Sequence, residues 1–229
     1  MSIDGVHGDA AGFIDKWRAR WPEWEIASVF VPEAQRPLAE AWFSLLQELT
    51  DAAWCGADPT PGLAKRAWWQ EELGGWAKGA RRHPLGKPLH SAPAPWLALG
   101  RALPDLRALR GDDQGVPAGA VAATPGEAFA AAVADCEAAL FGGRADAAAR
   151  SAVLQGLLGE RALLRGDPAS VAAAAAAGPG GAGAGRAAPG SRPRGVFAGL
   201  VAARVARPGR PVAPLRALFA AWRGARRAS

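Results

Sequence analysis

The sequence predicts an all-α protein, and two observations support this prediction. No stretch shows a sustained alternation of β-branched and polar residues, and tyrosine, which is common in strands, is absent. Apolar residues instead recur at helical spacing in segments separated by proline and glycine. At 229 residues, the chain is long enough for one ordinary domain whose core needs no disulfide or metal.

Helices are predicted along most of the chain, each bounded by proline, glycine or a polar loop. In order they cover about 12–21, 37–54, 61–78, 97–110, 125–140, 145–165, 196–206 and 214–228. The last is amphipathic, because Leu215, Leu218, Phe219 and Trp222 share one face with arginines around it. This pattern predicts a helix that contacts a membrane surface or a partner protein.

Composition divides the chain into three parts. Residues 1–167 are predicted to form a helical domain, and residues 196–229 two basic helices. Between them, 172–195 is alanine- and glycine-rich and has no large apolar residue, so we expect a flexible linker. Nine of the ten tryptophans lie between Trp17 and Trp96, which predicts a core built mainly from the first hundred residues.

Charge is distributed unevenly along the sequence. The net charge is +6, yet no acidic residue follows Asp167, while ten arginines do. A basic tail on an acidic body favours an anionic partner: a membrane surface, a nucleic acid, or the body itself. The tail lacks interleaved aromatic residues and the chain has no nucleic-acid-binding motif, so a nucleic acid is not expected.

Cysteine and histidine usage indicates a reducing compartment and gives no metal motif. Cys55 and Cys136 are isolated, and the three histidines lack a metal-binding spacing. The N-terminus has no signal-peptide pattern, and no window of about 18 apolar residues predicts a membrane span. We expect a cytoplasmic protein that contacts the inner face of a membrane peripherally through 214–228.

Two segments carry residues that suggest chemistry. Glu48 and Asp51 lie one turn apart on the second helix, a spacing that suits a Mg²⁺ ion shared with a diphosphate, although on spacing alone a solvated helix face is the simpler explanation. In "AKRAWWQEELGGW", Lys65, Trp69 and Glu72 fall on one face. Trp68 is rotated by about 100° from Trp69, so the two rings must pack on different neighbours.

Together these segments resemble the squalene/phytoene synthase superfamily. The family has a phenylalanine–proline–arginine segment before a helix with an acidic end, then an acidic–proline pair, a tryptophan helix and a His-Pro pair. Similar residues occur here in the same order: Phe30, Pro32 and Arg36; Glu48; Asp58 and Pro59; Lys65, Trp68, Trp69, Glu71 and Leu73; and His83 and Pro84. The resemblance covers roughly 26–89.

The resemblance implies an isoprenoid-synthase-like helical bundle around an apolar cavity. Active members condense two prenyl diphosphates, with Mg²⁺ held by aspartate-rich motifs on facing helices. By this resemblance Glu48 and Asp51 would hold Mg²⁺, and Arg36 and Lys65 would contact the diphosphate. Trp69 and Glu72 would line the site for a prenyl diphosphate or another lipid-like ligand.

The chain departs from the family pattern in its metal motifs. The first is reduced to Glu48 and Asp51, and no second D-x-x-x-D motif exists; only Glu160 and Asp167 lie near its expected place. We therefore expect a bundle that is truncated or degenerate in its C-terminal half, and two functions remain open. One is a divergent prenyl-diphosphate transferase, and the other is a non-catalytic member that binds a lipid or a protein partner, like the family's assembly factors for respiratory complexes.

Overall fold

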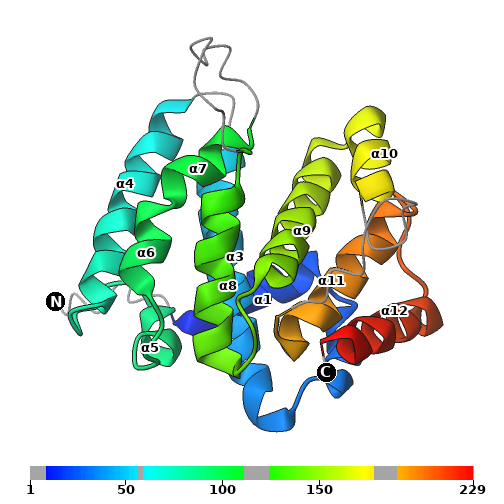
Figure 1. Ribbon diagram of the computed structural model, residues 1–229, viewed down its shortest axis with the longest axis horizontal. Helices are drawn as coiled ribbons and strands as arrows, with labels where there is room; N and C mark the ends of the chain where they lie inside the picture. Colours follow the sequence, from blue (N-terminus) through cyan, green and yellow to red (C-terminus); the bar gives the residue numbers. More distant parts are fainter. Residues whose placement is uncertain (1–8, 56–58, 111–123, 178–189, 229) are drawn as a thin grey trace, which may run out of the picture.

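The computed structural model describes residues 9–55, 59–110, 124–177 and 190–228. In these ranges the regular structure is entirely helical, which confirms the predicted all-α class (Figure 1). The α-helices are α1 Ala10–Arg20, α2 Trp24–Ala27, α3 Arg36–Trp54, α4 Pro59–Trp76, α5 Gly86–Leu89, α6 Trp96–Arg101, α7 Leu103–Ala108, α8 Glu127–Phe141, α9 Ala147–Arg165, α10 Pro168–Ala177, α11 Arg192–Val205 and α12 Pro214–Arg227. Two 3₁₀ turns, η1 Ser28–Phe30 and η2 Glu33–Gln35, precede α3.

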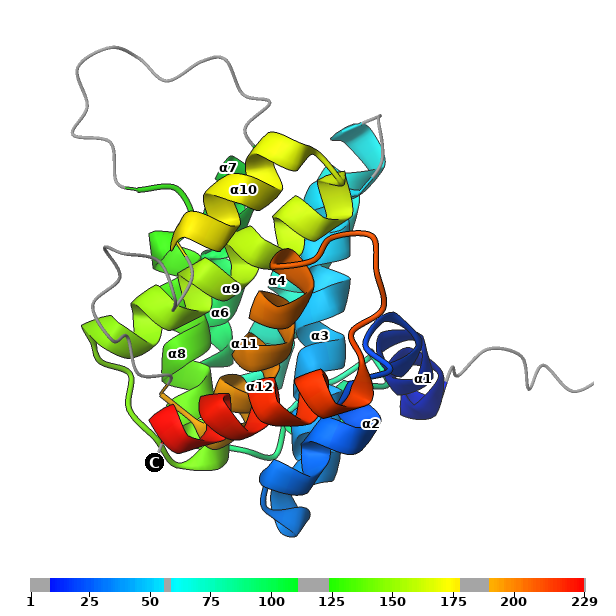
Figure 2. The same ribbon diagram turned by 90° about the vertical axis from the view of Figure 1, so that its right-hand side faces the viewer.

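Helix α3 lies in the middle of the bundle. It packs against α1 and α4, and α4 packs in turn against α6. On the other side of Figure 1, α8 packs against α9, α9 against α10 and α11, and α11 against α12. Helix α12 crosses the outer side of α11, as Figure 2 shows, so it forms the outermost layer there.

Polar side chains fix where several helices begin. Asp105 of α7 accepts hydrogen bonds from the backbone N–H groups of Gly126 and Phe129, both at 3.1 Å, and so caps α8 from a neighbouring helix. Asp146 caps α9 through the N–H of Ala149 at 2.9 Å. These caps join consecutive helices into one packed unit.

The core contains residues from both ends of the chain. Phe43 of α3 stacks on Phe197 of α11, with ring centroids 4.6 Å apart, and on Trp17 of α1 at 5.6 Å. The division by composition set 196–229 apart from the helical domain of 1–167. In the structure, α11 packs into the same hydrophobic core as the helices of that domain. The apolar face of α11 carries Val196, Phe197 and Leu200, and all three are buried.

The expected linker, 172–195, differs from the structure at both of its ends. Residues 172–177 belong to α10 and residues 192–195 form the first turn of α11, while 178–189 lie outside the described residues. Alanine has the highest helix propensity, so a run of alanines continues a helix once Asp167 has capped its start. Ser191 and Pro193 give α11 a favourable beginning.

Helices α11 and α12 meet at glycine and alanine rather than at large side chains. A Cβ atom added to Gly224 would lie 1.9 Å from the carbonyl oxygen of Gly195, and one added to Gly199 would lie 2.4 Å from that of Ala220. The two backbones therefore touch directly. This contact uses the small face of α12 and turns its larger apolar face outwards.

Candidate functional site

The two adjacent tryptophans of α4 differ in burial, although both rings contact His83. Trp69 is buried, while Trp68 is partly exposed and meets it edge-on, with centroids 5.1 Å apart. His83 lies against Trp69 at 4.6 Å and against Phe13 of α1 at 4.5 Å. Burial lowers the pKa of His83, so this ring is a neutral packing group that ties α1 to α4.

Glu72 holds the loop that follows α4. Its carboxylate accepts hydrogen bonds from the backbone N–H groups of Arg82 and His83, both at 2.7 Å, and from the indole of Trp76 at 2.8 Å. Burial opposes ionisation, but these donors and the Arg82 side chain keep the pKa of Glu72 below its usual value. With its oxygens satisfied from within the chain, Glu72 is placed to support the loop rather than to contact a ligand.

Glu48 and Asp51 lie together near the end of α3 and are paired with cationic side chains. Lys16 bridges them, with its Nζ 2.6 Å from Glu48 and 3.1 Å from Asp51. Lys65 reaches the second oxygen of Glu48 at 2.9 Å, and Arg20 binds Asp51 at 2.9 Å. Burial would raise the pKa of both carboxyls, but these partners outweigh it and hold both pKa values below their usual range.

The donor set of this cluster does not suit Mg²⁺. Three cations already face two carboxylates, so a divalent ion would enter a site of net positive charge. Within the described ranges, no group of three or more His, Cys, Asp or Glu side chains is placed to hold a metal ion. The arrangement can neutralise charge and join α1, α3 and α4, which is a structural task.

The other residues implied by the resemblance are only partly brought together. Arg36 lies at the start of α3, and its Nε donates to the carbonyl of Val31 at 3.1 Å. Glu48 is twelve residues further along the helix, about 18 Å away at 1.5 Å per residue. Arg36 therefore does not lie beside the pair formed by Glu48 and Lys65, and Asp58 lies outside the described residues.

Glu48 and Asp51, with the three cations that they bind, form what we call the α3 cluster. One of the two acids near the missing second motif approaches this cluster. Glu160 on α9 lies close enough to Asp51, Arg20 and Arg194 to feel their charges. Burial raises the pKa of Glu160 to about 7, against the opposing effect of the two arginines. Asp167 instead caps α10 through the N–H groups of Ala169 and Ser170 and takes no part in this cluster.

Sequence reasoning missed a buried ion pair between α8 and α11. Arg194 is 1% exposed and its Nε lies 2.9 Å from Oε1 of Glu137, which also accepts from the indole of Trp42 at 2.8 Å. The guanidinium lies over the Phe43 ring at 5.2 Å. A signal did exist, because Glu137 follows Phe129 and Val133 at four-residue steps and so lies on the buried face of its helix.

Helix α12 presents a second candidate surface. Its buried residues are the small ones, Ala217, Ala221, Gly224 and Ala225. Three of its four large apolar residues face outwards instead: Leu215 is 82% exposed, Phe219 56% and Trp222 40%, while Leu218 is half-buried. We call Leu215, Phe219 and Trp222 the α12 face.

Arginines surround the α12 face. Arg223 lies 5.7 Å from the Phe219 ring and Arg226 5.2 Å from the Trp222 ring, so both cations border the aromatic pair. Exposed aromatic and aliphatic groups rimmed by arginine favour contact with a surface that is apolar within and anionic at its edge.

Comparison with known proteins adds no relative. No family model, no curated protein and no solved structure matches the chain. In the part of the chain that the structure describes, no helix is long and apolar enough to cross a membrane. The α3 cluster and the α12 face are therefore the features of the described structure that bear on function.

Proposed function

We propose that this protein is a non-catalytic, lipid-binding member of a squalene/phytoene-synthase-like group, which docks peripherally on an anionic membrane through α12. The outward turn of the α12 face is the observation that carries the proposal. A helix that buries alanine and glycine while exposing leucine, phenylalanine and tryptophan leaves apolar area that the described part of the chain does not cover.

Charge selects an anionic lipid surface as that partner. Every charged residue after Asp167 is an arginine, and Arg207 and Arg210 in the turn before α12 are exposed. Each basic residue close to an anionic bilayer adds about 1 kcal/mol of attraction, and the aromatic rings suit the interface between headgroups and acyl chains. A protein partner would have to be strongly acidic to match this surface.

The α3 cluster supports a non-catalytic role. Diphosphate ionisation needs metal-bound carboxylates, whereas Glu48 and Asp51 are held by Lys16, Lys65 and Arg20. Family relatives that keep the bundle without the chemistry would use these positions as internal salt bridges. The isoprenoid-synthase-like scaffold thus serves as a frame for α12.

Vesicle sedimentation with the full chain tests membrane docking. Leu215→Ser/Trp222→Ser should lower the partition onto phosphatidylglycerol vesicles by about tenfold or more. The matched control Leu63→Ser/Leu97→Ser alters two similarly exposed apolar residues on α4 and α6 and should bind like the parent chain. Binding should also weaken with salt and be poor on phosphatidylcholine. Equal binding by the two double variants would refute docking through the α12 face.

A turnover assay tests the non-catalytic part of the proposal. Incubation of the full chain with farnesyl or geranylgeranyl diphosphate and Mg²⁺ should release no pyrophosphate. Release that is abolished by Glu48→Ala would show that the α3 cluster is an active site and would overturn the proposal.

A further inference from the structure

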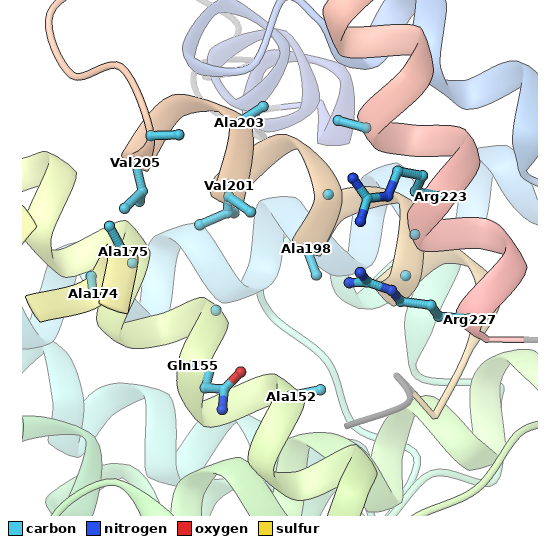
Figure 3. Close-up of a pocket in the computed structure, with 18 of the residues that line it drawn as sticks. Ala152, Gln155, Ala174, Ala175, Ala198, Val201, Ala203, Val205, Arg223 and Arg227 are labelled. Carbon is cyan, nitrogen blue, oxygen red and sulfur yellow. The ribbon is translucent and has the colours of Figure 1, made fainter. Parts of the chain in front are cut away.

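A cavity of about 650 Å³ opens between α9, α10, α11 and α12 (Figure 3). This volume falls within the range of pockets that hold small organic ligands. Neither ring of the Phe43–Phe197 stack lines it, and no residue of the α3 cluster does. The cavity therefore requires its own explanation.

Small side chains create the cavity. Gly156 and Gly159 line it from α9, and Ala198 and Ala202 from α11, where larger residues would fill the space. The two helices converge at Gly159, since a Cβ atom there would lie 2.7 Å from Val201. Most of the lining is apolar, which suits a hydrocarbon chain.

Cationic side chains lie on the α12 side of the cavity. Arg216, Arg223 and Arg227 line it, and Figure 3 shows Arg223 and Arg227 projecting from α12 towards the space. No acidic residue of the described chain belongs to the lining, and Gln155 adds a neutral polar group from α9. An anionic headgroup would meet these guanidinium groups, which suit carboxylate and phosphate alike.

The cavity connects with the α12 face through Phe219. This residue lines the cavity and is also 56% exposed. A lipid entering from a membrane under α12 would pass the arginines with its headgroup last. Both the apolar space and the arginines that line it therefore lie next to the surface proposed for docking.

We propose that this cavity binds a single-chain anionic amphiphile, with its hydrocarbon chain in the space lined by α9, α10 and α11 and its carboxylate or phosphate on Arg216 and Arg223. The proposal rests on the proposed membrane docking for the source of the lipid. It deepens that function, because the protein then withdraws one lipid molecule from the surface instead of only adhering to it.

Binding of cis-parinaric acid, a fluorescent single-chain carboxylate, tests the proposal without vesicles. The full chain should bind the acid saturably below its micelle concentration, and the methyl ester should bind at least about tenfold more weakly, equivalent to ~1.4 kcal/mol. Competition with hexadecanoate and with hexadecyl phosphate then distinguishes the two headgroups. Unsaturable binding, or equal affinity for acid and ester, would overturn the proposal.

Two pairs of variants locate the site. Ala198→Leu fills the cavity and should weaken binding of the acid about tenfold or more, whereas Ala173→Leu, on an exposed part of α10 outside the lining, should not. Arg216→Gln/Arg223→Gln should remove the preference for acid over ester, while Arg210→Gln/Arg226→Gln should keep it. If circular dichroism shows that Ala198→Leu does not fold, the comparison of the two arginine double variants alone tests whether the acid binds in this cavity.

Parallel vesicle sedimentation separates this proposal from docking. Ala198→Leu should still bind phosphatidylglycerol vesicles, because it leaves the α12 face intact. Loss of docking in Leu215→Ser/Trp222→Ser with unchanged binding of the acid would support both proposals. Docking by the parent chain without any binding of the acid would overturn the cavity proposal alone, and the reverse result would overturn docking alone.

Discussion

The two halves of this bundle pack by opposite means. Around α1, α3 and α4, large rings fill the interior: Trp17, Trp24, Trp42 and Trp69 are all among the largest fully buried side chains. Around α11 and α12, glycine and alanine bring backbones into contact. In the first arrangement the large rings fill the interior space. In the second, a cavity lies beside the contact between α11 and α12, and the large residues of α12 lie at the surface.

The difference teaches that apolar content alone does not locate a core. Alanine contributes little buried area per residue, so the C-terminal helices depend on close approach and on a few anchors such as Phe197. Tryptophan-rich packing instead gains much area from few residues. The first region should therefore be destabilised most by removal of a large side chain, and the second by addition of even a small one.

Removal of a large ring should have the largest effect, and only in the first region. Trp69→Ala should lower the free energy of unfolding by ~3–5 kcal/mol, because it leaves a cavity under α4. The matched change Trp222→Ala, on the α12 face, should stay within about 0.5 kcal/mol. Urea denaturation monitored by circular dichroism measures both. Comparable losses would show that Trp222 is buried in solution and that the two regions do not differ.

The buried ion pair joins the two regions, so breaking it should cost nearly as much. Arg194→Met leaves Glu137 buried beside Trp42 without its cation, and should lower the free energy of unfolding by ~3–5 kcal/mol. Arg194→Met/Glu137→Gln removes the unpaired charge and should recover part of the loss. A double variant no more stable than Arg194→Met would mean that lost packing on Phe43, rather than charge, dominates.

Addition of a methyl group should break the second region. Gly224→Ala places a Cβ atom 1.9 Å from the Gly195 carbonyl and should cost ~1–3 kcal/mol as α12 is pushed away. The same change at Gly12 of α1, where nothing lies within 4 Å, should instead stabilise by about 0.5–1 kcal/mol. Thermal unfolding of both variants would show the opposite signs. A gain in both would mean that α12 does not pack closely on α11.

The sequence predicted much of the fold because its helix boundaries are marked locally. Proline and glycine placed the predicted helices within a few residues of α1, α3, α4, α8, α9, α11 and α12. The alanine-rich start of 172–195 belongs to a helix rather than to a linker, because alanine favours helix even where low complexity resembles a linker. Composition could not reveal that the helix begun by Ser191 returns to the core through Arg194 and Phe197.

The candidate sites were less predictable, because pairing is a property of three-dimensional contact. Helical spacing did place Glu48 and Asp51 together on α3. Nothing in that spacing could show that Lys16 and Arg20, from a helix 28 or more residues earlier, would neutralise them. The amphipathic pattern of α12 was visible, but its outward orientation follows from the glycine contact with α11.

The smallest predicted effect concerns Glu160, where the second region meets the charged cluster of the first. Its folded pKa of about 7 exceeds the ordinary value of 4.5, so the folded state binds the extra proton between these two pH values. Stability should therefore fall as pH rises through this window, and remain reduced above it.

Glu160→Gln removes the burial of charge next to Asp51, while Arg194 and Arg20 keep their other partners. The variant should match the parent chain near about pH 5 and exceed its free energy of unfolding by about 1–2 kcal/mol near about pH 8. Glu71→Gln, an exposed carboxyl on α4, serves as the control and should leave the pH profile unchanged. If urea denaturation shows the same pH dependence for Glu160→Gln and the parent chain, then α9 does not bring a half-buried carboxyl to this boundary.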